Sequence, residues 1–142
     1  MQKLTWDTIQ QNAIKFVKRW ANVTSEKQQD QGFIEALLRV FGIQDARAVG
    51  MFQEKTRIDG NIKWIDYLWK GKIAIEMKSK GEDLDEALDQ LSKYMYSLPQ
   101  DDMPDLWMVS DFENMRISRR STNEIWKFKT KDLRKHIKNL QI

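Results

Sequence analysis

The sequence of 142 residues has no cysteine, one histidine and two prolines. Without cysteine the chain cannot form disulfides, a thiolate zinc site or a cysteine nucleophile, and this composition suits a reducing cytoplasm. With His136 as its single histidine, the chain cannot supply the site of a two-histidine phosphodiesterase. A Ser-His-Asp hydrolase is also poorly supported. No apolar run approaches the roughly 20 residues that span a membrane, and charged residues interrupt the amino-terminal segment, unlike in a signal peptide. We therefore expect a soluble, cytoplasmic protein without membrane contact.

The most informative pattern is an acid, nine intervening residues, and then Glu-x-Lys: Asp66, Glu76 and Lys78. The pattern predicts one strand over 64–69 and a second over 72–79, joined by a short turn that brings Asp66 opposite Glu76. Because successive side chains of a strand alternate between faces, Glu76 and Lys78 should point the same way. Two adjacent carboxylates repel each other unless a divalent cation lies between them, and hard oxygen ligands suit Mg2+. This combination is typical of a metal-dependent nuclease.

Two other interpretations of this pattern have to be weighed. A Glu-x-Lys pair is also common on a solvated, salt-bridged sheet face, but the apolar run 73–75 favours a central strand that is covered on both sides. Charges at the end of such a strand are costly without a purpose. Asp59 is a rival to Asp66 as the metal-binding acid, but the following Gly60 should place it in a turn. We favour Asp66.

A helix is predicted after this strand pair. Acids at 82–83 begin it, an apolar stripe of leucines continues it, and Pro99 forbids its extension. Gln90 and Tyr94 are four residues apart and therefore share one side of the helix. By spacing alone they are an ordinary amphipathic edge, but their position after Glu-x-Lys makes them candidate site residues.

Taken together, these residues resemble the PD-(D/E)xK nucleases, and the Gln-x-x-x-Tyr helix resembles the RecB-related branch of that superfamily. More narrowly, the segments 65–71, 76–81, 83–94 and 109–112 are similar to the amino-terminal endonuclease domain of MmeI-like restriction-modification enzymes of type IIG, subclass IIL. The resemblance extends over about 25–129. It implies an α/β fold, a PD-(D/E)xK restriction-endonuclease-like sandwich with a central mixed β-sheet flanked by helices.

The resemblance also implies an activity, Mg2+-dependent hydrolysis of phosphodiester bonds in double-stranded DNA, with Mn2+ as a substitute for Mg2+. Methyltransferase and target-recognition domains would follow in the same full-length chain, and S-adenosylmethionine would be a cofactor only if that methyltransferase exists. Relatives commonly self-associate to cut both strands. Two alternatives are a non-catalytic DNA-binding or docking module with this fold, which the intact Asp, Glu and Lys set argues against, and a solitary repair or phage-type nuclease.

The family's division of labour can be placed on matching residues. Asp66, Glu76 and the backbone carbonyl of Met77 would bind the metal ion. Lys78 would orient the attacking water and stabilise the charge that develops on the phosphate. Gln90 and Tyr94 would support the site from their helix.

An accessory acid is expected on the helix before the sheet. We predict that this helix begins at Ser25, where Ser25 and Gln28 resemble a capping box. Glu26 lies seven residues before the apolar Phe33 and thus on nearly the same side of the helix, whereas Glu35 lies on the opposite side. Glu26 is therefore the candidate, although a first-turn glutamate that serves the helix dipole is an equal alternative.

DNA contacts are predicted from the charge pattern. Acids dominate 81–111 and bases dominate 112–142, so one surface could meet phosphate and another could not. Arg119 and Arg120, at an expected strand turn, and Lys80 are the candidates. The basic residues of the carboxyl-terminal segment are more simply explained as a solvated helix surface.

The length fits a single nuclease domain, 1–142. We divide it into an amino-terminal helix (1–24), a catalytic core (25–129) and a carboxyl-terminal helix (130–142). Further strands are expected at 45–56, on an edge of the sheet, and at 106–110, 115–118 and 125–128. The apolar stripe of the last segment should pack on something, so we expect an excised amino-terminal domain of a longer chain.

Overall fold

The computed structural model describes residues 3–20, 23, 29–58 and 60–142. Within these ranges no helix combines the length and the apolar character that crossing a membrane requires. The elements in chain order are α1 (Trp6–Trp20), α2 (Asp30–Val40), α3 (Ala46–Val49), β1 (Met51–Ile58), β2 (Asn61–Trp69), β3 (Ile73–Met77), α4 (Leu84–Met95), the 3-10 helix η2 (Gln100–Asp102), β4 (Leu106–Ser110), β5 (Asn114–Arg119), β6 (Glu124–Lys129) and the 3-10 helix η3 (Thr130–Lys135).

The strands form one six-stranded sheet in the order β1-β2-β3-β4-β5-β6. Only β3 and β4 are parallel, because α4 carries the chain back between them, and the other neighbours are antiparallel. All five residues of β3 and all five of β4 are buried, as expected of central strands that are covered on both faces. The predicted α/β class and mixed sheet are confirmed.

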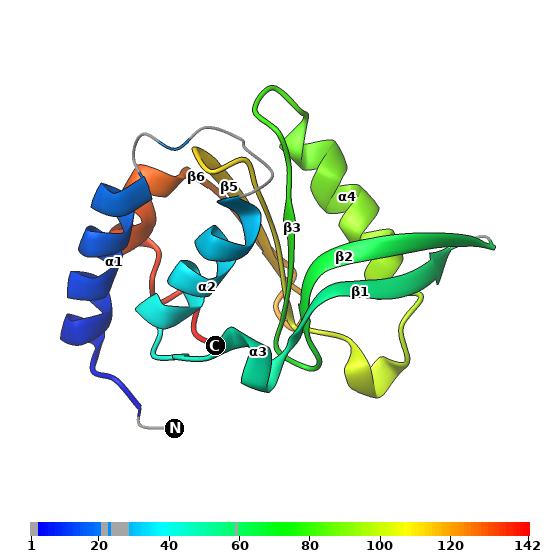
Figure 1. Ribbon diagram of the computed structural model, residues 1–142, viewed down its shortest axis with the longest axis horizontal. Coiled ribbons are helices and arrows are strands. Elements are labelled where there is room, and N and C mark those ends of the chain that lie inside the picture. Colours follow the sequence, from blue (N-terminus) through cyan, green and yellow to red (C-terminus); the bar gives the residue numbers. More distant parts are fainter. Residues whose placement is uncertain (1–2, 21–22, 24–28, 59) are drawn as a thin grey trace.

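Helices cover the two faces of the sheet separately (Figure 1). The helices α1 and α2 pack on one face, where Phe33 of α2 shares a core with Ile73 and Ile75 of β3. The helix α4 packs on the other face, where its leucines contact Ala74 of β3 and Val109 of β4. Alternate side chains of β3 therefore enter two different cores, and the face that Ala74 shares with Glu76 is the one beneath α4.

Local sequence signals fix the helix ends near this strand. Asp83 caps α4, since its carboxylate accepts hydrogen bonds from the backbone N–H groups of Asp85 (3.0 Å) and Glu86 (3.1 Å). Gly42 ends α2 with a φ of 94°, and the N–H of Ile43 donates back to the carbonyl of Leu38 at 3.1 Å, as in a Schellman motif. The short connection from β3 to the capped α4 holds this helix against the end of the strand.

The structure differs from the sequence-based expectations in two elements. The edge strand begins at Met51 rather than at Asp45, because Asp45 accepts from the N–H of Arg47 at 3.1 Å and caps α3 instead. The segment 130–142 is a 3-10 helix followed by turns, not an α-helix, and its apolar side chains pack in the core with α1. The predicted helix start at Ser25 lies outside the described residues.

Candidate active site

The β2–β3 hairpin brings Asp66 and Glu76 together. Tyr67 pairs with Ile75, so the next position along each strand sets Asp66 across from Glu76. Asp66 Oδ2 accepts a hydrogen bond of 2.7 Å from the backbone N–H of Met77. The ladder between the two strands stops at this point, and the Asp66 carboxylate takes the place of a backbone acceptor.

Glu76 carries a carboxyl group whose burial in the fold is energetically unfavourable. Its residue is only 8% exposed, beneath α4 and at the end of a central strand. Burial raises the pKa of Glu76 to about 9, assisted by a hydrogen bond with Asp66 and by the negative charge of Asp66, while the positive charge of Lys78 acts in the opposite direction. The two carboxyl groups are therefore close enough to share a proton, or to share a cation in its place.

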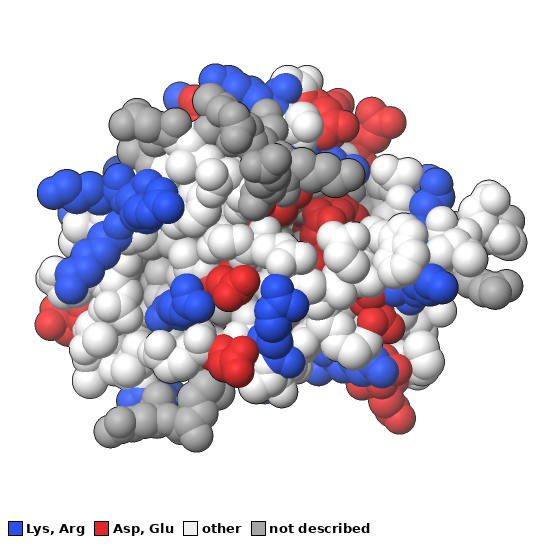
Figure 2. All heavy atoms as spheres, in the orientation of Figure 1, with Lys and Arg blue, Asp and Glu red and all other residues white. Residues whose placement is uncertain are grey.

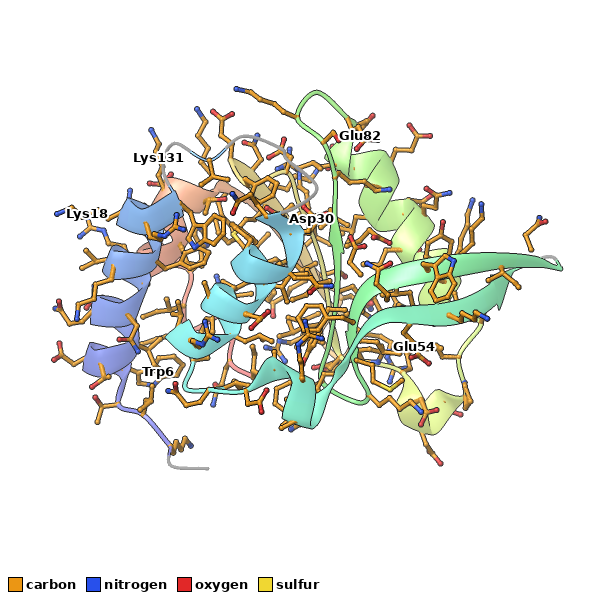
Figure 3. The ribbon with its side chains drawn as sticks, in the orientation of Figure 1. Trp6, Lys18, Asp30, Glu54, Glu82 and Lys131 are labelled. Atoms are coloured by element: carbon orange, nitrogen blue, oxygen red, sulfur yellow. The ribbon has the colours of Figure 1, made fainter. Side chains whose placement is uncertain are left out.

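Lys78 follows β3 directly and lies beside the Asp66 and Glu76 pair. Its backbone N–H donates to the carbonyl of Ser110 at 2.8 Å, which extends the parallel contact with β4 by one residue, and its side chain is half-buried. The next turn is fixed by Glu82, labelled in Figure 3 at the start of α4, which accepts from the N–H of Ser79 at 2.7 Å. Lys80 points outward: its side chain is 65% exposed and forms an ion pair of 3.3 Å with Glu113.

The helix α4 adds Tyr94 and Gln90. Burial, and then the charge of Glu76, raises the pKa of the Tyr94 phenol, which places the ring near the carboxyl pair. Gln90 is exposed one turn earlier. Both residues line a hollow of about 340 Å³ between α4 and the outer part of β2, whose walls are Asn61, Lys63, Glu86, Asp89, Gln90, Lys93 and Tyr94. The structure therefore brings Asp66, Lys78 and Tyr94 near Glu76. Gln90 shares only the hollow with Tyr94.

One residue near this site was missed by the sequence reasoning. Gln53 of β1 lies across from Asp66, and its Nε2 donates to Asp66 Oδ1 at 3.2 Å. Nothing in the residue type or its spacing from Asp66 could have identified it, because the contact depends on the register of the β1–β2 pairing. With Met77, Gln53 supplies a donor to each oxygen of the Asp66 carboxylate.

The oxygen donors at this point suit a divalent cation. Two carboxylates face each other, and Met77 directs its backbone N–H toward Asp66, so that its carbonyl turns to the same side of the strand. Mg2+ takes one or two carboxylates and keeps several waters, so two carboxylates are sufficient. Across the ranges that the structure describes, no group of three His, Cys, Asp or Glu side chains is placed to hold a metal ion. Figure 2 shows acidic atoms set back in a recess to the right of centre, while Lys and Arg side chains protrude from the same face.

Other expected residues lie elsewhere or cannot be placed. Glu26 is outside the described residues, as is Asp59, and the described part of α2 begins at the half-buried Asp30 (Figure 3). Their roles stay predictions.

Arg119 and Arg120 lie at the other end of the sheet. Arg119 pairs with Leu106, the first residue of β4, whereas the candidate site is at the last residues of β3. Arg119 forms an ion pair of 2.8 Å with Asp105 and donates to the carbonyls of Asn139 (3.2 Å) and Gln141 (2.9 Å). Arg120 is exposed. The structure does not bring either arginine to the carboxyl pair.

Comparisons with known proteins add one finding to this geometry. Neither the curated proteins nor the solved structures give a match. The family model for the MmeI N-terminal domain matches residues 11–142, which covers the whole sheet, α4 and most of α1. The chain belongs to the MmeI N-terminal domain family, a family of restriction-enzyme domains.

Proposed function

We propose that this chain is a Mg2+-dependent endonuclease domain that hydrolyses phosphodiester bonds of double-stranded DNA as the restriction part of a restriction-modification enzyme. The observation that carries the proposal is the pair of facing carboxyl groups, Asp66 and Glu76, with Lys78 beside it. Folding alone does not favour two adjacent carboxyl groups of which one is buried, since each raises the cost of ionising the other. Membership of the MmeI N-terminal domain family supplies the restriction context.

The fold supports the same proposal. A mixed sheet with helices on both faces, and an Asp, Glu and Lys set at the end of its central hairpin, is the arrangement that a PD-(D/E)xK sandwich would require. In this proposal methyltransferase and target-recognition domains belong to the full-length chain, S-adenosylmethionine serves only that methyltransferase, and self-association allows both strands to be cut.

Each residue has a role that its position permits. Asp66, Glu76 and the carbonyl of Met77 would hold Mg2+, which supplies Lewis-acid polarisation of the phosphate and a more acidic water. The Lys78 ammonium, on the same strand face as Glu76, orients the attacking water and stabilises the negative charge that develops on the phosphate. Tyr94 and Gln90 would support the site from α4.

Nicking of supercoiled plasmid tests the reaction, because one broken phosphodiester converts the whole molecule to open circle. With Mg2+ or Mn2+ the chain should nick the plasmid, and Lys78→Ala should slow nicking by about 100- to 1000-fold, the loss expected for one electrostatic contributor. Calorimetric Mn2+ binding should survive in Lys78→Ala. Lys70→Ala is the matched control, because Lys70 precedes β3, is 56% exposed and pairs with Asp102 at the other end of the strand.

Two results would contradict the proposal. Unchanged Mn2+ binding in Asp66→Ala would remove the metal assignment. Mn2+ binding that depends on Asp66, combined with no nicking by the unaltered chain, would favour the non-catalytic DNA-binding module instead.

A further inference from the structure

Gln53 has an unusual backbone for a residue in a strand. Its φ is 57°, in the left-handed region that residues other than glycine rarely adopt. The pairs on either side, Phe52 with Tyr67 and Glu54 with Ile65, keep one register, so the irregularity is confined to the position across from Asp66. Backbone strain of this kind persists only where the surroundings impose it, and it concentrates at functional sites.

The facing strand is irregular at the same place. Ile65 and Leu68 of β2 both pack in the core under α4, although strict alternation would put residues three apart on opposite faces. The side chains of β2 therefore change the face of the sheet toward which they point within the segment that contains Asp66. This change coincides with the lateral reach of the Asp66 carboxylate to the N–H of Met77 on β3.

The two donors leave the Asp66 carboxylate fixed but not saturated. Gln53 Nε2 donates to Oδ1 at 3.2 Å, and the Met77 N–H donates to Oδ2 at 2.7 Å. Each carboxylate oxygen has two lone pairs, so each keeps one after these bonds. A carboxylate held at both oxygens can present its remaining lone pairs toward Glu76 without first losing rotational freedom.

We propose that Gln53 is a positioning residue, whose side-chain amide orients the Asp66 carboxylate for binding of a divalent cation between Asp66 and Glu76. The inference rests on the proposed function, because it requires Asp66 to be a cation ligand. Groups that orient a metal ligand through hydrogen bonds typically account for 10- to 100-fold in metal affinity. Since Gln53 is exposed, we expect the lower end of that range.

A purely structural role for Gln53 is the rival explanation, and two substitutions separate it. Gln53→Gly removes the amide and also relieves the left-handed backbone, so a purely structural role predicts that any loss of cation affinity is accompanied by a loss of thermal stability. Gln53→Met keeps the length of the side chain and the same backbone demand but cannot donate. If the amide positions Asp66, both variants lose affinity, even though glycine fits the backbone better.

The experiment is calorimetric Mn2+ binding by the full chain, together with the thermal midpoint of each variant. We expect Kd for Mn2+ to rise about tenfold in both Gln53→Gly and Gln53→Met, while the midpoint of Gln53→Gly equals or exceeds that of the unaltered chain. Lys55→Met is the control, because Lys55 lies two residues further along β1 with its ammonium over the Trp64 ring, 5.3 Å from the centroid. Its affinity should not change.

The proposal is overturned if either Gln53 variant binds Mn2+ as tightly as the unaltered chain, or if Gln53→Gly loses affinity and thermal stability together. Asp66→Asn distinguishes this failure from that of the proposed function. If Asp66→Asn abolishes binding while the Gln53 variants do not weaken it, only the positioning role is wrong. If Asp66→Asn binds Mn2+ normally, the metal site itself is misassigned, and the positioning role falls with it.

Discussion

Two acidic groups at opposite ends of the sheet have pKa values that are shifted in opposite directions. At the end of β3, Glu76 is buried against a second carboxylate, and its pKa rises to about 9. At the start of β4, burial also raises the pKa of Asp105, but hydrogen bonds from Ser121 and Arg119 outweigh it and hold the pKa below the ordinary value. The Arg119 guanidinium is 2.8 Å from Asp105 Oδ2, and the Ser121 N–H is 2.8 Å from Oδ1.

The comparison separates charges that serve stability from charges that need another explanation. Asp105 is compensated by an opposite charge and by donors from its own chain, so it stabilises the fold. Glu76 is compensated only in part, by Lys78, and a compact sheet would be more stable with an amide or an apolar side chain in its place. The proposed cation site would explain an acid at this position.

Glu76→Gln should produce the largest effect, on cation binding. The variant keeps the shape of the side chain but removes one of the two carboxylate ligands. We expect Kd for Mn2+ to rise by more than about 100-fold, beyond the 10- to 100-fold typical of groups that only orient a ligand. Titration calorimetry measures it, and an unchanged Kd would place the cation elsewhere.

The same variant should change how stability depends on pH. The pKa of Glu76 is about 9 in the folded chain against an ordinary value of 4.5, so between these values the folded state holds a proton that the unfolded state has released. The free energy of unfolding therefore falls as pH rises through this window, by at most about 1.4 kcal/mol per pH unit.

Urea denaturation in EDTA at pH 5, 7 and 9 should show this decline in the unaltered chain and a flatter profile in Glu76→Gln. The variant should also be more stable than the unaltered chain at pH 9, because its amide can donate to Asp66. Parallel profiles for the two proteins would show that Glu76 titrates normally.

Arg119→Met should have a smaller effect, on stability alone. It leaves Asp105 without its cation and two carboxyl-terminal carbonyls without a donor, so we expect a loss of about 1–3 kcal/mol in the free energy of unfolding. The contribution of Asp105 is present above its ordinary pKa of 3.8 and is lost as pH falls through its lowered folded pKa, the reverse of the Glu76 dependence. Mn2+ affinity should be unchanged, and a parallel loss of affinity would show that the two ends are coupled.

The sequence predicted the hairpin and α4 well because their signals are local. Alternation, a tight turn and an apolar run are sufficient to set Asp66 across from Glu76, and Pro99 limits the helix that carries Tyr94. These features need no knowledge of what packs against them.

Apart from the start of β1, which the local Asp45 cap of α3 moves to Met51, the features that the sequence did not predict involve contacts between distant segments. Gln53 reaches Asp66 only through the strand register, and Arg119 is recruited by Asp105 and by carbonyls about 20 residues away along the chain. The apolar spacing of Leu133, Ile137 and Leu140 fits an α-helix, but tertiary bonds hold this segment in tighter turns: the N–H of Thr130 donates to the carbonyl of Glu113, and Arg119 takes two carbonyls near the end. Periodicity does not report such competition.

The left-handed backbone at Gln53 has a consequence beyond the site. β1 is an edge strand, and its outward N–H and C=O groups could template pairing with a second molecule. The neighbouring Val49 (37% exposed) and Met51 (46% exposed) make this edge apolar where it begins. The local reversal of φ at Gln53 interrupts the flat row of backbone groups, and Lys55 adds a charge two residues later. We therefore expect the left-handed residue also to hinder pairing of this edge with a second molecule.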